Sequence, residues 1–475
     1  MRDVRIKGKV SDIMIAGYIL NPSASDYSPV RMAQEYGALC PEISEENETA
    51  LKTAALNGAW EKVIKQIEEN DQLSLLYDIE MPLSKVLSSM EVTGFLVDRE
   101  SIQQYGAVLE EKINSLVSEI YDLAGEEFNI NSPKQLGTIL FEKLGLPAKK
   151  KTKSGYSTNA DVLEGLAPDY PIVSLILEYR TLAKLKSTYC DGLQKCIAPD
   201  GRIHSTLNQT ETKTGRISST EPNLQNIPVR TPVGRELRKF FIAKEGCVLV
   251  DADYSQIELR VLSDIANDET MISAFNNGDD IHTITASQVF NMPVEAVTPL
   301  MRSRAKAVNF GIVYGIGAFS LAHDIGVTRA EADKYIKGYL HHFSGVDSYM
   351  KNVIAKAKED GYVQTLFKRR RYLPELAASN AMIRNFGERV ARNMPIQGTA
   401  ADIIKIAMVR VYDRLEKENL KSKLIMQIHD ELIVEAPENE QAQVQKIIRE
   451  EMENACKMKV KLTADVHCGK SWYDA

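Results

Sequence analysis

The stretch Cys247-Val-Leu-Val-Asp-Ala-Asp-Tyr254 decides the fold, because it is an apolar strand that ends in acidic residues. A helical pattern begins directly after it, near Gln256. A second acidic element, Leu424-Ile-Met-Gln-Ile-His-Asp-Glu-Leu-Ile-Val-Glu435, has two β-prone runs around a polar centre, which predicts a hairpin with Asp430 and Glu431 at its tip. Helical patterns flank both β-elements. The sequence therefore predicts an α+β fold with an antiparallel sheet at its centre.

The aspartates of these two elements are candidate metal ligands. Magnesium prefers oxygen ligands and typically takes one or two carboxylates, together with waters and substrate phosphates. Asp253 and Asp430 would repel each other if their strands were neighbours, unless a cation lay between them. The backbone carbonyl of Tyr254 offers a further oxygen. The plainer alternative is that Asp253 caps the helix that starts near Gln256 and that Asp430 is only a turn residue.

A cationic and aromatic stripe marks a helix in the middle of the chain. Arg302, Lys306, Phe310 and Tyr314 recur every four residues and therefore share one helix face. A triphosphate along this face would meet the two cations, aided by the positive end of the helix dipole, and its base and sugar would meet the rings. The alternative is a solvated cationic face with the rings in the core. Glycine in a helix costs about 1 kcal/mol, so we expect close approach by something other than side chains at three positions: Gly311, Gly315 and Gly317.

A polar loop, Thr214–Pro228, carries many amide and hydroxyl groups and little apolar surface. An ordinary surface loop is the default interpretation. The same groups would also suit contacts to phosphates, sugars and minor-groove base edges, where the acceptor atoms are common to all base pairs.

Length, charge and composition limit the class of protein. The 475 residues allow roughly two to four compact units. No apolar run approaches the roughly 20 residues of a membrane span. The formal net charge is −7, which is unusual for a nucleic-acid binder, but local fields bind phosphates and basic residues cluster at Lys149–Lys153 and Lys368–Arg371. The six cysteines form no CxxC pair, which predicts reduced thiols in a cytoplasmic protein.

Three of these segments resemble the signature motifs of the family A DNA polymerases: Asp253-Tyr-Ser-Gln-Ile-Glu-Leu-Arg260, the helix from Arg302 to Gly315, and Gln427-Ile-His-Asp-Glu431. Thr214–Pro228 and Asn393–Asp402 are similar to further segments of the family. The resemblance extends from about Tyr77 to the C-terminus. It implies a right-hand polymerase fold with an antiparallel-sheet palm, helical fingers and a helical thumb. The expected boundaries are a remnant of an exonuclease-like domain at 1–77, thumb at 78–197, palm at 198–256 and 383–475, and fingers at 257–382.

The resemblance also implies roles for single residues. Asp253 and Asp430 would hold two Mg²⁺ ions, with Mn²⁺ as an expected substitute, and Tyr254 would assist. Lys306 would neutralise charge that builds up on the phosphates, while Arg302 and His282 would hold the outer phosphates. Glu258 resembles a steric gate against a ribose 2′-hydroxyl, Phe310 predicts discrimination against dideoxynucleotides, and Gln256 and Tyr314 complete the nucleotide pocket. The expected DNA contacts are Arg216, Gln225, Asn393, Gln397, Arg389, His429, Glu431, Lys184 and Lys186.

The activity implied is primer extension in DNA replication or repair. The expected partners are primer-template DNA and deoxynucleoside triphosphates, and we expect a monomer in the cytoplasm. We expect neither 5′-nuclease nor proofreading activity, since Ser11–Ser23 resembles only the tail of a proofreading domain and Asp78-Ile-Glu80 lies where the thumb should begin. Three alternatives remain open: a single-subunit RNA polymerase, which Glu258 opposes, a metal-dependent nuclease, which the Arg302 and Lys306 helix opposes, and an inactive primer-template clamp.

Overall fold

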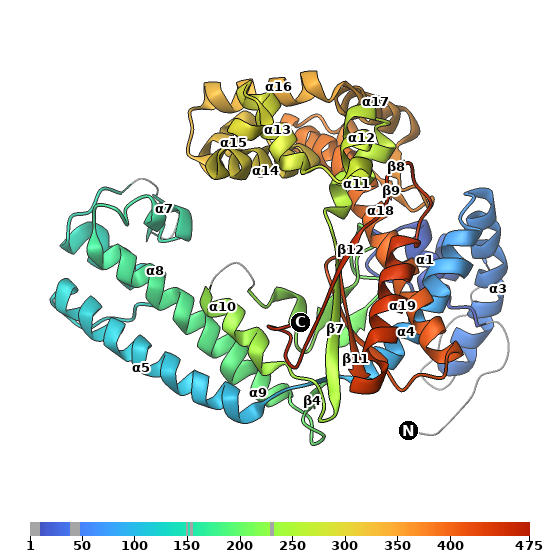
Figure 1. The fold of residues 1–475 in the computed structure, drawn as a ribbon, viewed down its shortest axis with the longest axis horizontal. Helices are drawn as coiled ribbons and strands as arrows, with labels where there is room; N and C mark the ends of the chain where they lie inside the picture. Colours follow the sequence, from blue (N-terminus) through green and yellow to red (C-terminus); the bar gives the residue numbers. More distant parts are fainter. Residues whose placement is uncertain (1–9, 39–47, 149–150, 153–154, 229–231) are drawn as a thin grey trace.

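A four-stranded antiparallel sheet stands at the centre of the computed structural model, which describes residues 10–38, 48–148, 151–152, 155–228 and 232–475 (Figure 1). The strand order is β10-β11-β7-β12. The hairpin predicted from the second acidic element is confirmed, because its two strands pair on either side of a turn at His429 and Asp430. The strands are β7 (Cys247–Tyr254), β10 (Lys423–Ile428), β11 (Glu431–Pro437) and β12 (Ala464–Gly469).

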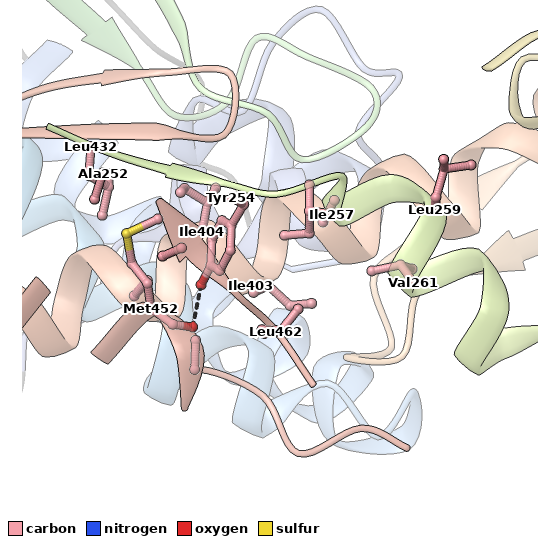
Figure 2. Packing of buried hydrophobic residues seen from close by; sticks show 14 of the residues in the cluster. Ala252, Tyr254, Ile257, Leu259, Val261, Ile403, Ile404, Leu432, Met452 and Leu462 are labelled. Atoms are coloured by element: carbon pink, nitrogen blue, oxygen red, sulfur yellow. Dashed lines mark hydrogen bonds between the residues drawn. The ribbon is translucent and has the colours of Figure 1, made fainter. Parts of the chain in front are cut away.

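The two faces of the sheet have different environments. Val248, Val250 and Ala252 of β7 enter one large core, whereas Leu249, which points the other way, enters a second core. Side chains alternate along a strand, so Asp253 lies on the Leu249 face. Figure 2 shows part of the first core, where the Tyr254 hydroxyl donates to the Met452 carbonyl at 2.7 Å. Burial of one face thus fixes the direction of the carboxylates on the other.

Three helices cover the first face. The longest of them is α18 (Ala381–Lys417), which is buried along much of its length and packs against β10 and several helices. It contacts α19 on the sheet and also α11 (Ile257–Ile265) and α17 (Ser344–Asp360), so it joins the sheet to the upper helical part of the molecule (Figure 1). The three are α4 (Met81–Thr93), α18 (Ala381–Lys417) and α19 (Gln441–Glu453).

The upper part is a group of helices that follows β7 directly. The helical pattern expected from Gln256 onward is confirmed except at one place. The hairpin of β8 (Tyr362–Gln364) and β9 (Arg370–Tyr372) interrupts it. The helices are α11 (Ile257–Ile265), α12 (Glu269–Asn277), α13 (Ile281–Phe290), α14 (Pro299–Val313), α15 (Ala318–Ile325), α16 (Arg329–His342) and α17 (Ser344–Asp360).

The basic run Lys368–Arg371 is only partly a solvated surface, since the Lys368 side chain is 45% exposed but the next residue is not. Arg369 is only 1% exposed and lies among carboxylates. Arg370 donates to the Asn70 side chain at 2.7 Å. The charges of this run therefore join parts of the chain to one another.

A second helical arm extends from the opposite side of the sheet (Figure 1). Its long helices α5 (Arg99–Ala124) and α8 (Pro171–Lys184) pack side by side, as the sequence pattern of Ile102 to Ala124 predicts for α5. The expected loop after Gly145 contains a small hairpin of β2 (Lys151–Thr152) and β3 (Gly155–Tyr156). The lysines at 149, 150 and 153 lie outside the described residues. Short elements at the base of this arm are α9 (Gly192–Cys196), α10 (Pro232–Glu236), β1 (Phe95–Leu96) and β4 (Arg202–Ile203).

The N-terminal unit has its own small core. Helices α1 (Ile13–Leu20), α2 (Pro29–Glu35) and α3 (Glu48–Glu69) enclose it, and Phe367 and Ile406 of the main body pack against it. A π-helical turn, η2 (Leu75–Glu80), continues into α4. Among the described residues, no helix is long and apolar enough to cross a lipid bilayer.

Candidate active site

A row of carboxylates crosses three strands of the sheet. Asp253 of β7 lies directly opposite Glu431 of β11 on one side and Asp465 of β12 on the other. Asp430 joins them at the hairpin turn, where its carbonyl accepts from the Tyr254 amide at 3.1 Å. The structure therefore brings Asp253 and Asp430 together. Sequence reasoning missed Asp465, although the alternating pattern from Ala464 to Gly469 is a weak strand signal.

Burial and neighbouring acids raise the pKa values of Asp253 and Asp430. Burial raises the pKa of Asp253, and the nearby Asp430, Glu431 and Asp465 raise it further. Burial also raises the pKa of Asp430, with Glu258 and Glu431 adding to the effect. Like charges on neighbouring strands destabilise a sheet, and a bound cation would remove that cost. The carboxylates therefore fit a divalent metal site.

The plainer interpretation of Asp253 is wrong. The residue at the N-cap of α11 is Gln256, in a left-handed conformation with φ of 55°, and no side chain caps this helix end. Asp253 is thus free of a capping role.

The cationic and aromatic stripe faces the carboxylates across a cleft. Arg302, Lys306 and Phe310 project from α14, and Tyr314 follows at its C-cap. All four line a cleft of about 770 Å³ together with Asp253 and Asp430. The alternative, with the rings in the core, is wrong because Tyr314 is 46% exposed and Phe310 is only partly buried.

The expectation for the three glycines is not confirmed. The space beside Gly311 is filled by the Ile316 side chain, and that beside Gly315 by Arg389. Gly315 also has φ of +67°, a backbone conformation that glycine adopts without strain. In the described part of the chain, no atom lies within 4 Å of a Cβ built at Gly317. The glycines thus shape the turn after α14 and admit neighbouring side chains.

Partners within the protein hold the phosphate-binding candidates. Arg302 donates to Asp280 at 2.5 Å. The Asn309 amide donates to Nδ1 of His282 at 2.9 Å, and Thr285 donates to the Asn309 oxygen at 3.1 Å. Burial lowers the pKa of His282 to about 4, so the ring is neutral at pH 7. Because Nδ1 accepts, the ring proton lies on Nε2, where it is free to donate.

The gate candidate Glu258 is held on both oxygens. Arg216 donates to its Oε1 at 2.7 Å, and the Tyr314 hydroxyl donates to its Oε2 at 3.0 Å. The carboxylate is 8% exposed. Its position beside the stripe is therefore fixed from two directions.

Comparison with known proteins agrees with this geometry. A sequence profile described as DNA polymerase family A matches residues 99–474. The chain belongs to this family. It is 48% identical to DNA polymerase I of Caldicellulosiruptor bescii over 464 residues and 48% identical to that of Bacillus subtilis over 491 residues. The two matches cover 98% and 99% of this chain but only 55% and 56% of the relatives. The chain therefore spans about half the length of these relatives.

A solved structure shares the fold of this family A chain. The POL domain of Pol1 from M. smegmatis, in complex with DNA primer-template and dNTP, matches with a TM-score of 0.93 and 40% identity. The match covers 98% of this chain and 82% of that one. The right-hand fold, with an antiparallel-sheet palm and helical fingers and thumb, is therefore confirmed.

The DNA-contact candidates of this family A chain divide into two groups. Gln225 and His429 line the cleft beside Arg216. Gln397, with its amide oxygen turned toward Arg216, accepts from both terminal guanidinium nitrogens at 3.2 Å. Asn393 lies on α18, where it donates to the Val313 carbonyl at 3.4 Å.

The members of the second group lie apart from one another, with Glu431 in the carboxylate row itself. Arg389 lines a neighbouring cleft of about 980 Å³ on the other side of the α14 stripe. Glu431 accepts from the Trp472 indole at 2.5 Å and lies 3.5 Å from Arg238, two partners that sequence reasoning missed. Lys184 is exposed near the end of α8, and Lys186 is paired with Asp191 at 3.0 Å.

Proposed function

We propose that this chain is a template-directed DNA polymerase that adds deoxynucleotides to a primer 3′ end. One observation carries the proposal: Asp253 of β7, Asp430 of the hairpin turn beside it and a cationic, aromatic helix face line one cleft. Nucleotidyl transfer needs negative charge held for metal ions on one side and positive charge for a triphosphate on the other. The primer-template and dNTP in the related M. smegmatis complex support DNA and deoxynucleotides as the partners here.

Asp253 and Asp430 would hold two Mg²⁺ ions, with Mn²⁺ as a substitute. Two such ions, when bound, would lower the pKa of the primer 3′-hydroxyl and stabilise the pyrophosphate leaving group. The described residues offer no ready-made cluster of three or more metal-binding side chains. Magnesium commonly takes one or two carboxylates and completes its shell with water and substrate phosphates. The Tyr254 carbonyl is the further oxygen proposed.

The α14 stripe and His282 would hold the triphosphate. Arg302 would exchange its ion pair with Asp280 for a phosphate, and the Nε2 proton of His282 would donate to another phosphate oxygen. Lys306, one helical turn on, would neutralise charge that develops at the transferred phosphate. The helix N-terminus adds a positive dipole end near the outer phosphates.

Sugar selection would follow from the walls of the same pocket. Glu258, held by Arg216 and Tyr314, would collide with a ribose 2′-hydroxyl. Phe310 has no hydroxyl with which to replace the missing 3′-hydroxyl of a dideoxynucleotide. Gln256 lines the cleft beside Glu258 and completes the pocket. We therefore propose preference for deoxynucleotides over both analogues.

The remaining residues would bind the primer-template. Thumb, palm and fingers are proposed at 78–197, at 198–256 with 383–475, and at 257–382. The thumb lysines would bind duplex phosphates, and the other contacts are Arg216, Gln225, Asn393, Gln397, Arg389, His429 and Glu431. We propose a monomer.

Excision activity is not part of the proposed function. Glu80 of the Asp78-Ile-Glu80 sequence is fully buried and paired with Arg369 and Lys405. A carboxylate committed to two cations does not serve as an exonuclease metal ligand.

A primer-extension assay tests the proposal. A primed DNA template would be incubated with Mg²⁺ and, in separate reactions, deoxy, ribo and dideoxy nucleotides. Extension with deoxynucleotides is expected, with little ribo or dideoxy incorporation. A primer with a mismatched 3′ end should stay uncut. Absence of extension on matched primers would overturn the proposed activity.

A further inference from the structure

Tyr18 connects the N-terminal unit to the main body. It lies on α1, is fully buried, and donates its hydroxyl proton to the Thr212 carbonyl at 2.6 Å. A buried hydroxyl without a partner costs free energy, so this hydrogen bond is retained for as long as α1 stays docked. The N-terminal unit therefore holds one end of the segment from Thr212 to Arg216.

This segment is a tight turn with little freedom. The Thr212 hydroxyl donates to the Arg216 carbonyl at 2.7 Å and closes the turn. Gly215 has φ of +87°, and a Cβ built there would lie 2.6 Å from Nε of Arg369. The Arg369 side chain thus packs directly against the turn backbone, which leaves room for glycine only.

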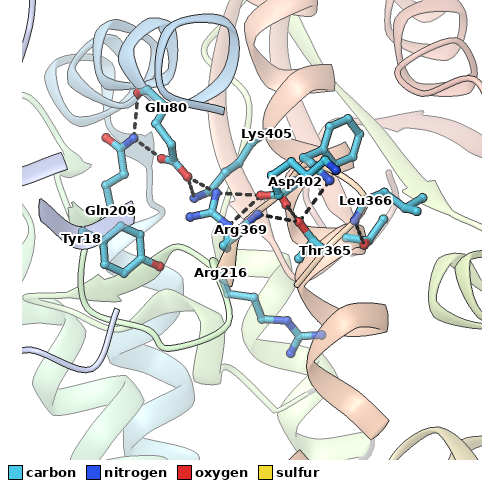
Figure 3. A network of polar contacts seen from close by, with 12 residues as sticks. Tyr18, Glu80, Gln209, Arg216, Thr365, Leu366, Arg369, Asp402 and Lys405 are labelled. Carbon is cyan, nitrogen blue, oxygen red and sulfur yellow. Dashed lines mark hydrogen bonds and ion pairs between the residues drawn. The ribbon is translucent and has the colours of Figure 1, made fainter. Parts of the chain in front are cut away.

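Arg369 is itself held by a buried ion cluster (Figure 3). It donates to Asp402 from Nε at 2.9 Å and from a terminal nitrogen at 2.6 Å, and it also pairs with Glu80. Lys405 donates to the same Glu80 oxygen at 2.7 Å. All four side chains are buried, so the support beneath the turn is rigid.

The turn ends at the residue that fixes the gate. Arg216 leaves the turn and donates to Oε1 of Glu258 at 2.7 Å. Three hydrogen bonds, joined through the covalent structure of Thr212 and Arg216, therefore link Tyr18 to Glu258. Small displacements at a pocket wall alter discrimination between substrates that differ by one hydroxyl.

We propose that Tyr18 is a positioning residue for sugar discrimination. Through Thr212 and Arg216, it keeps the Glu258 carboxylate in the position where it would contact the 2′-position of the nucleotide. The N-terminal unit then helps to shape the nucleotide pocket. This inference rests on the proposed polymerase function.

The test compares two single-hydroxyl deletions in the same unit. Tyr18→Phe removes the hydroxyl that reaches Thr212. Tyr27→Phe is the matched control, because Tyr27 contacts the Tyr18 ring in the same core and donates at 2.8 Å only to the Asn21 carbonyl within the N-terminal unit. The readout is the ratio of kcat/KM for deoxynucleotide to kcat/KM for ribonucleotide on one primed template.

Tyr18→Phe should lower this ratio by about threefold to tenfold, the range of one hydrogen bond, while Tyr27→Phe leaves it unchanged. Both variants should lose similar thermal stability. In a Glu258→Ala background, Tyr18→Phe should cause no further fall, because the group that it positions is gone.

Equal ratios in the two variants, or a fall of the same size without Glu258, would overturn the inference while leaving the polymerase function intact. Failure of the unmodified chain to extend primers would overturn the proposed function, and the inference with it.

Discussion

At the scale of single residues, the site depends on which charges have partners and which do not. Glu258 has both oxygens occupied by protein donors. Asp253 instead lies among other acids, which raise its pKa. A carboxylate held by hydrogen-bond donors keeps a fixed position in the wall of the pocket, whereas a carboxylate surrounded by other acids favours binding of a cation.

Glu258→Ala tests the wall. Removing the carboxylate should raise ribonucleotide incorporation by about tenfold or more, since a steric and polar barrier is lost. The measurement is single-nucleotide insertion with matched deoxy and ribo substrates. Glu245→Ala, an exposed acid at the other end of β7, serves as control. An unchanged ratio for Glu258→Ala would refute the gate assignment.

Phe310→Tyr tests the ring of the stripe. The added hydroxyl should replace a hydrogen bond that dideoxynucleotides lack, and it should raise dideoxy incorporation by about tenfold with little change for deoxynucleotides. Competitive insertion of the two substrates measures this. If dideoxy use stayed at the level of the unmodified chain, Phe310 would not contact the sugar.

At the scale of elements, the ion cluster joins three separate pieces of chain. Glu80 ends η2, Arg369 precedes β9, and Asp402 and Lys405 lie on α18. Burying charge is costly unless every charge is paired. The cluster therefore fixes how these elements pack together. Removing one charge would leave an opposite charge buried without its partner, which destabilises the fold.

Glu80→Gln should destabilise the protein by about 3 kcal/mol at pH 7, because two buried cations lose a carboxylate. Burial alone would raise the pKa of Glu80, but Lys405 and Arg369 outweigh it and lower the pKa from 4.5 to about 2. A carboxylate whose pKa is lower in the folded than in the unfolded state stabilises the fold at pH values above its unfolded pKa. This stabilisation is lost as the pH falls toward the folded pKa. The difference in free energy of unfolding between the variant and the unmodified chain should therefore become smaller as the pH falls from 4.5 to 2.

Urea unfolding at several pH values measures this gap. Glu69→Gln is the control, because its pairing with Lys65 at 3.9 Å is exposed and should contribute less than about 1 kcal/mol. If the difference in free energy of unfolding for Glu80→Gln stayed constant down to pH 2, the negative charge of Glu80 would not be the stabilising feature.

Elements with a strong local period were predictable. The apolar run of β7, the hairpin of β10 and β11 and the helix α5 follow from sequence pattern, as does the shared face of Arg302, Lys306 and Phe310. The hairpin of β8 and β9 was not, since it is short and lies between long helices. The pair of Glu80 and Arg369, 289 positions apart, leaves no local pattern at all.

At the scale of the whole molecule, the cleft is assembled from distant parts of the chain. Sequence motifs singled out Asp253, Asp430 and the α14 stripe, which the structure brings to one cleft. Asp253 and the stripe lie on elements with a clear periodicity, and Asp430 lies in the turn between two β-prone runs. Asp280, Asp465 and Trp472 were missed, since their roles depend on contacts that only the folded chain makes. The hydrogen bond from Tyr18 to the Thr212 carbonyl, 194 positions away, also leaves no local pattern in the sequence.

The most direct test of the account is primer extension by Asp253→Asn, which removes the charge at the centre of the carboxylate row and preserves its shape. The rate in Mg²⁺ should fall by about a thousandfold or more, as expected when charge that stabilises a transition state is lost. Binding of primer-template, measured by fluorescence anisotropy, should be retained. Asp360→Asn, at an exposed helix end, should extend normally. Extension by Asp253→Asn at a rate near that of the unmodified chain would contradict the account.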